Sequence, residues 1–140
     1  MSEIAAEIVC PADSRVLFGS LRESSGLFLK SKFFDYEELL GFDKPSWLKA
    51  FNGVDFMICR LTPDKYHYNH TPVAGVARDF YMTDGQYHSC NPGALLTLAT
   101  PHSKNKRTIT IIDTDVSGGT DVGLVAMIEV VALMIGDILC

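Results

Sequence analysis

The residues with the clearest potential for chemistry lie in one short stretch, TPDKYHYNHTP at positions 62–72. It holds two of the four histidines, His67 and His70, and has a proline near each end, Pro63 and Pro72. Because proline fixes φ and removes a backbone donor, we expect a stiff loop. Imidazole is the side chain whose ordinary pKa lies nearest neutrality, so two of them on such a loop indicate proton transfer. Ordinary loop histidines are the alternative.

A metal site is a second alternative. His67 and His70 could combine with His88 and Cys90 into a set of four ligands. The spacings, His-x-x-His and His-x-Cys, are not typical of structural zinc sites. We therefore expect no metal, and interpret Cys90 as a small buried apolar residue.

The elements that must position this loop are mainly strands. Apolar runs at 55–61 and 73–82 flank the loop, and further runs occupy 108–113 and 123–135. This pattern predicts a mainly β fold, with antiparallel sheets in a sandwich- or barrel-like core and one or two short helices. The histidine loop would then lie at one end of a sheet.

Two local features add detail to this prediction. Residues 14–21 and 26–33 are separated by only RESS, which predicts an opening β-hairpin. In residues 34–51, Gly41 is placed to end one short helix and Pro45 to open a second.

The composition indicates a single folded domain spanning residues 1–140. The chain is 47% apolar and 21% charged, which is far from the composition of disordered proteins. Its net charge is −5, and we interpret its short basic run, SKNKR at 103–107, as a solvated loop. Nucleic acid is therefore not an expected partner.

Cysteine spacing and the chain's apolar segments bear on its location. The N-terminus lacks the basic-then-apolar pattern of a signal peptide, and residues 122–139 are interrupted by Glu129 and Asp137, which favours buried strands over a membrane-spanning helix. We expect a cytoplasmic protein, at most peripheral to a membrane. No C-x-x-C pair occurs, so we expect free thiols at all four cysteines: Cys10, Cys59, Cys90 and Cys140.

The segment RLTPDKYHYNHTPVAG resembles the signature of the phosphatidylserine decarboxylase family. PADSRVLFGSL resembles the Pro-Ala-Asp-Gly opening of that family, with Ser14 in place of its glycine. FDYEELLG, YHSCNPGALL, SKNKR and IEVVALMIGDI resemble further family blocks in the same order. The resemblance covers nearly the whole chain.

The resemblance implies a lyase that converts phosphatidylserine to phosphatidylethanolamine with a pyruvoyl group made by self-cleavage at a serine. It implies that Asp13 and His70 form a triad with that serine, His70 as base and Asp13 as the group that orients it. The resemblance also implies that His67 delivers a proton during decarboxylation. We interpret Tyr66 and Tyr68 as packing or loop-anchoring aromatics. Asp13 could also serve simply as a cap on the turn after Pro11.

The resemblance also implies that one component lies elsewhere. The family forms its pyruvoyl group in a Gly-Ser-Thr or Gly-Ser-Ser segment, which no serine of this sequence matches. We therefore expect a fragment that corresponds to most of the β-chain portion and is inactive alone. An exposed sheet edge near 122–139 would favour pairing with an α-chain or a second copy.

The expected ligand is phosphatidylserine or a related amino-acid head group. A membrane surface is a further candidate partner, contacted through Phe33, Phe34 and Trp47, although core packing is the favoured role for these aromatics. Two other functions stay open. One is a non-catalytic module of the same fold that binds lipid, head group or a partner chain, and the other is a decarboxylase of a soluble amino acid.

Overall fold

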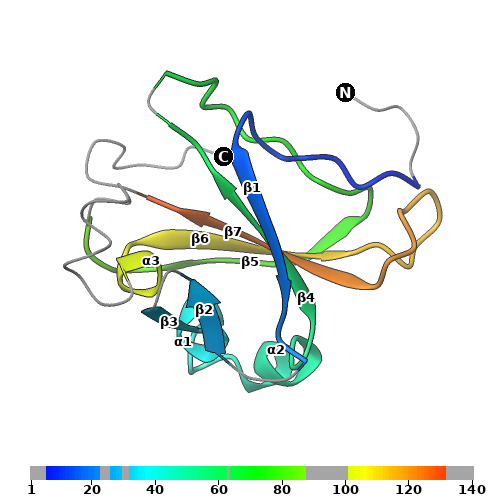
Figure 1. Cartoon of the computed structure of the whole chain (residues 1–140). Coiled ribbons are helices and arrows are strands. Elements are labelled where there is room, and N and C mark those ends of the chain that lie inside the picture. Colours follow the sequence, from blue (N-terminus) through cyan, green and yellow to red (C-terminus); the bar gives the residue numbers. More distant parts are fainter. Residues whose placement is uncertain (1–5, 23–25, 30–31, 63, 88–100, 132–140) are drawn as a thin grey trace. The chain divides into compact units, whose positions relative to one another are not determined.

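The computed structural model describes residues 6–22, 26–29, 32–62, 64–87 and 101–131 (Figure 1). Strands predominate in these ranges, so the mainly β prediction is confirmed. The strands are β1 Arg15–Ser20, β2 Gly26–Leu29, β3 Lys32–Asp35, β4 Asp55–Arg60, β5 Val76–Thr83, β6 Arg107–Asp113 and β7 Leu124–Val130. The helices are α1 Tyr36–Leu40, α2 Pro45–Ala50 and α3 Pro101–Lys104.

The described strands form three sheets: β1 with β4, β2 with β3, and β5-β6-β7 in that order. The first two pairs are antiparallel. The chain divides into two compact units, one drawn from Met1–Ser20, Asp55–Asp79 and Thr110–Met127, the other from Leu21–Val54, Phe80–Ile109 and Ile128–Cys140. A single domain stays a prediction. None of the helices in the described ranges has the length and apolar character needed to cross a membrane.

The predicted opening hairpin is wrong. β1 pairs with β4, with Arg15 opposite Arg60 and Ser20 opposite Asp55, while β2 pairs with β3. Only two positions separate β2 from β3, so this pairing closes a shorter loop than the one across RESS. β1 is thereby left to pair with a strand distant in sequence.

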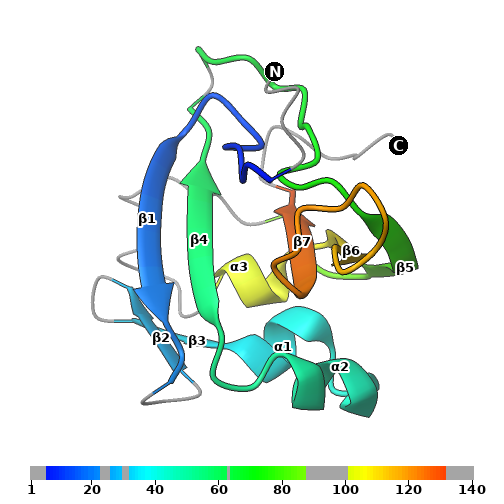
Figure 2. The same ribbon diagram turned by 90° about the vertical axis from the view of Figure 1, so that its right-hand side faces the viewer.

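The β1–β4 ladder determines which connections meet. In an antiparallel pair the start of one strand lies beside the end of the other, and Figure 2 shows the two arrows side by side and pointing in opposite directions. The segment that enters β1 therefore lies next to the segment that leaves β4. The first contains Asp13 and the second contains both histidines of the loop.

The two predicted helices are confirmed in the second unit. α1 ends at Leu40, followed by Gly41 with φ of 102°, a conformation that glycine adopts without strain. Pro45 is the first residue of α2, as its fixed φ favours. Trp47 is half-buried there, whereas the side chains of Phe33 and Phe34 lie outside the described part.

The basic run SKNKR is not a solvated loop. Ser103 lies in α3 and is buried, and Arg107, which begins β6, is only 3% exposed. The guanidinium of Arg107 donates to the carbonyl oxygens of Leu39 (2.8 Å), Ser103 (2.8 Å) and Asn105 (3.0 Å). Its burial lowers its pKa. These carbonyls give a buried cation the hydrogen bonds that it would otherwise make with water.

The same region holds a carboxylate, Glu38 of α1. It accepts hydrogen bonds from the hydroxyl of Ser103 and from Nζ of Lys104, each at 2.6 Å. Partial burial alone would raise the pKa of Glu38, but the hydrogen bonds from Lys104 and Ser103 outweigh it and lower that pKa. The basic run therefore ties α3 to α1.

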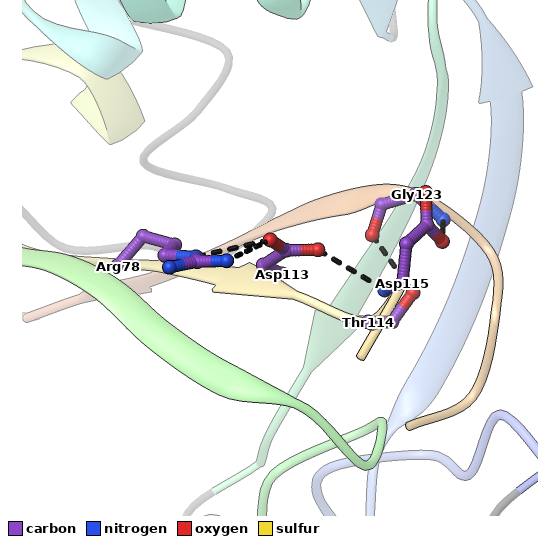
Figure 3. A network of polar contacts seen from close by, with 5 residues as sticks. All are labelled: Arg78, Asp113, Thr114, Asp115 and Gly123. Atoms are coloured by element: carbon purple, nitrogen blue, oxygen red, sulfur yellow. Dashed lines mark hydrogen bonds and ion pairs between the residues drawn. The ribbon is translucent and has the colours of Figure 1, made fainter. Parts of the chain in front are cut away.

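Among the strands whose side chains are described, β6 is the most buried, and it is the middle strand of its sheet. The segment that follows it is fixed by the polar network in Figure 3. Arg78 of β5 donates from Nε (3.0 Å) and Nη2 (2.6 Å) to one oxygen of Asp113, while the other accepts from the amide of Asp115 (3.0 Å). Asp115 in turn accepts from the amide of Gly123 (2.9 Å). The hydrogen bonds from Arg78 lower the pKa of Asp113.

Candidate active site

The histidine loop is held by backbone hydrogen bonds to the segment that enters β1. The amide of His70 donates to the carbonyl of Pro11, and the amide of Val9 donates to the carbonyl of Pro72, both at 2.9 Å. Pro72 is buried, while Pro63 lies outside the described residues. These two hydrogen bonds tie the loop to the segment that enters β1 and place His70 next to the turn that carries Asp13.

His67 is exposed, with one ring nitrogen fixed. Its Nδ1 lies 2.6 Å from the carbonyl oxygen of Lys65. Because a carbonyl only accepts, this contact is a hydrogen bond when Nδ1 carries a proton. Nε2 is then the nitrogen available to exchange a proton with a ligand.

His70 is partly buried and stacks against Tyr66, with ring centroids 5.8 Å apart and planes inclined by 4°. Tyr66 also contacts Tyr68 at 5.2 Å. Tyr66 therefore orients the His70 ring, as a loop-anchoring aromatic should. Tyr68 is 72% exposed and covers little beyond the Tyr66 ring.

Asp13 does not contact the His70 ring. Among the described residues its carboxylate pairs with Nζ of Lys65 at 3.4 Å, and both side chains are about half exposed. An exposed pair of this kind contributes roughly 0–1 kcal/mol, so releasing the carboxylate to another partner requires little energy. The backbone brings Asp13 and His70 together, and their proposed pairing stays a prediction.

An open depression of about 420 Å³ lies at the same end of the β1–β4 ladder. Its charged lining consists of three basic and two acidic side chains: Arg15, Arg60, Lys65, Asp13 and Asp64. His67 and His70 do not line it. The sequence interpretation assigned no role to the two arginines, because their proximity follows from a strand register that pairs distant segments.

Two cysteines lie close to Ser14, the residue after Asp13. The sulfur atoms of Cys10 and Cys59 are 3.8 Å apart, and the sulfur of Cys10 lies 3.6 Å from the Ser14 hydroxyl. Both are free thiols, as expected; Cys90 and Cys140 lie outside the described residues.

These two thiols should differ in reactivity. Cys10 is exposed, whereas Cys59 is half-buried and burial raises its pKa. Since the thiolate is the reactive form, iodoacetamide near neutral pH should label Cys10 about tenfold faster than Cys59. Mass spectrometry of timed digests measures both rates, and the denatured chain, in which the rates should converge, is the control. Equal rates in the folded protein would contradict this assignment.

The metal alternative finds no support in the described part of the chain. No group of three or more histidine, cysteine or acidic side chains is arranged there to hold an ion. His88 and Cys90, half of the set considered from the sequence, lie outside the described residues.

The site thus defines a class of protein: a mainly β protein whose histidine loop is hydrogen-bonded to the turn that carries Asp13. Residues 2–140 match the family model of phosphatidylserine decarboxylase. The chain is 36% identical over 131 residues to phosphatidylserine decarboxylase proenzyme 2 of Oryza sativa, 31% over 131 to proenzyme 3 of Schizosaccharomyces pombe, and 32% over 132 to the proenzyme of Fusobacterium nucleatum.

The chain therefore belongs to the phosphatidylserine decarboxylase family. These alignments cover 92%, 93% and 94% of this chain but only 20%, 13% and 42% of the three relatives. The chain thus spans less than half the length of each of them. The family's activity is that of a carboxy-lyase, and the names of the relatives describe them as proenzymes.

Proposed function

We propose that this chain is the part of a phosphatidylserine decarboxylase that supplies proton transfer both for self-cleavage and for release of carbon dioxide. The observation that carries the proposal is the fixed histidine loop, joined to the Asp13 turn by the hydrogen bond from the His70 amide to Pro11. This arrangement lies within the family match over residues 2–140.

Each side chain has a separate role in this proposal. His70, positioned by Tyr66, takes the proton of a serine hydroxyl, which is a weak nucleophile without a base. Asp13 leaves Lys65 and orients the His70 ring, fixing which nitrogen accepts. His67, with Nδ1 held by the Lys65 carbonyl, exchanges a proton with the substrate through Nε2.

The family's pyruvoyl group fits this set of residues. It supplies an electron-accepting carbonyl, and the chemistry that remains is proton transfer, which two imidazoles and a carboxylate perform. The residues of this chain would hold and move protons beside that group. They would not form it, because its serine is not among the positions matched here.

The test uses a longer chain that continues into the family's serine segment, incubated with vesicles containing phosphatidylserine. Formation of phosphatidylethanolamine with release of carbon dioxide supports the proposal, and the 140-residue chain alone should release none. Vesicle binding without carbon dioxide release would indicate a non-catalytic lipid-binding module. Release from free aromatic amino acids, but not from phosphatidylserine, would indicate a decarboxylase of soluble substrates.

A further inference from the structure

Arg15 and Arg60 form a like-charge pair in the β1–β4 ladder. They are directly opposite in its register, and residues in that relation project from the same face with Cβ atoms about 4.5–5.5 Å apart. Both line the open depression beside the histidine loop. Like charges directly opposite one another destabilise a strand pair, so this placement needs a compensating group.

The side chains of the depression provide only part of that compensation. Lys65 is paired with Asp13 at 3.4 Å, and Asp64 accepts a hydrogen bond from the Thr62 hydroxyl. In the described part of the chain, neither guanidinium forms an ion pair with a carboxylate. The three basic and two acidic side chains leave an excess of one positive charge, which matches a singly charged anion.

We infer that Arg15 and Arg60 bind the phosphodiester of the substrate head group, an inference that rests on the proposed function. Guanidinium groups present paired donors that match the oxygens of a phosphate. One diester between the two strands would accept hydrogen bonds from both arginines and relieve their repulsion. The head group would then lie at the end of the ladder from which the histidine loop departs.

The chemistry of decarboxylation favours the phosphate over the carboxylate as the bound anion. The carboxylate loses its negative charge as carbon dioxide leaves. Two guanidinium groups on it would therefore stabilise the ground state more than the transition state and slow the reaction. The phosphodiester keeps its charge throughout, so binding it anchors the substrate without opposing the chemistry.

Isothermal titration calorimetry on the 140-residue chain tests the inference with four soluble probes. Glycerophosphoserine and glycerophosphoethanolamine share the diester, serine carries only the carboxylate, and inorganic phosphate serves as the simple anion. We expect the two diesters to bind similarly and serine to bind far more weakly. Arg15→Gln and Arg60→Gln should each weaken diester binding about tenfold.

Arg22→Gln is the matched control, because Arg22 is exposed and lies outside the depression. Arg60→Lys keeps the charge but loses the paired donors, so its affinity should fall between those of the parent and Arg60→Gln. Thermal unfolding checks folding separately. Without ligand Arg60→Gln should melt no lower than the parent, and glycerophosphoethanolamine should raise the midpoint of the parent more than that of Arg60→Gln.

The inference would be overturned if free serine bound as tightly as the two diesters. It would also be overturned if Arg22→Gln weakened diester binding as much as Arg15→Gln and Arg60→Gln do. Its failure can be told apart from failure of the proposed function. A longer chain that releases no carbon dioxide refutes the proposed activity, whatever the binding results. A working decarboxylase whose KM for phosphatidylserine is unchanged by Arg15→Gln and Arg60→Gln refutes the phosphate site alone.

Discussion

Replacing His70 by alanine should nearly abolish self-cleavage in a longer chain that carries the family's serine segment. The rate should fall by about a hundredfold or more, since a serine hydroxyl near neutral pH depends on a positioned base. The position of that base is set by the hydrogen bond to Pro11 and the stack on Tyr66. Denaturing gels measure the outcome: the parent gives two bands over time and His70→Ala gives one.

Asp13→Asn should slow the same cleavage by a comparable factor, because an amide does not stabilise the imidazolium that forms. Lys65→Gln separates this role from the ion pair seen in the structure. If Asp13 acts on His70, removing Lys65 leaves cleavage intact, whereas a purely structural ion pair makes Lys65→Gln as damaging as Asp13→Asn. Tyr68→Phe controls for disturbance of the exposed loop. Cleavage of His70→Ala at the parent rate would contradict the assignment.

The parts of the fold that the sequence predicted are those determined locally. Gly41 and Pro45 mark the end of α1 and the start of α2 through backbone preferences that need no distant partner. The strands β4, β5 and β6 follow from apolar runs bounded by turn residues. The histidine loop was likewise recognisable from residue types alone.

The errors concern long-range pairing and burial. The partner of β1 is β4, and pattern alone does not distinguish it from the nearer strand β2. The sequence predicts a solvated SKNKR because all five of its residues are polar or charged, yet backbone carbonyls of α1 and of the run itself accept hydrogen bonds from Arg107 in a buried position. The pairing of β1 and the burial of Arg107 both depend on contacts between segments that are distant in sequence.

Gly75 shows how a motif can be recognised before its physical cause is known. PVAG was notable only as part of a family-like signature. In the structure a Cβ at Gly75 would collide with the backbone carbonyl oxygen of Asp113 and with the side chain of Ile112. Only glycine lets the segment that follows the histidine loop approach β6 this closely. Gly75 therefore supports the loop from its C-terminal end.

His67→Gln should separate the two reactions. In the longer chain the variant should still self-cleave, because His70 is the base that we propose for that step, but it should release carbon dioxide about 10²–10⁴ times more slowly. Glutamine can keep a hydrogen bond to the Lys65 carbonyl, so the loop geometry is preserved while the proton exchanged at Nε2 is lost. Gels measure processing, and phosphatidylethanolamine formation by the fully processed protein measures turnover.

The ratio of the two effects decides between a catalytic and a structural His67. Loss of both reactions in parallel would show that His67 only maintains the loop, and retention of both would show that another group delivers the proton. Tyr68→Phe, one position along the same exposed segment, should change neither rate. A fall in kcat with little change in KM is expected, because an exposed imidazole that acts in proton transfer stabilises the transition state and contributes little to holding the head group.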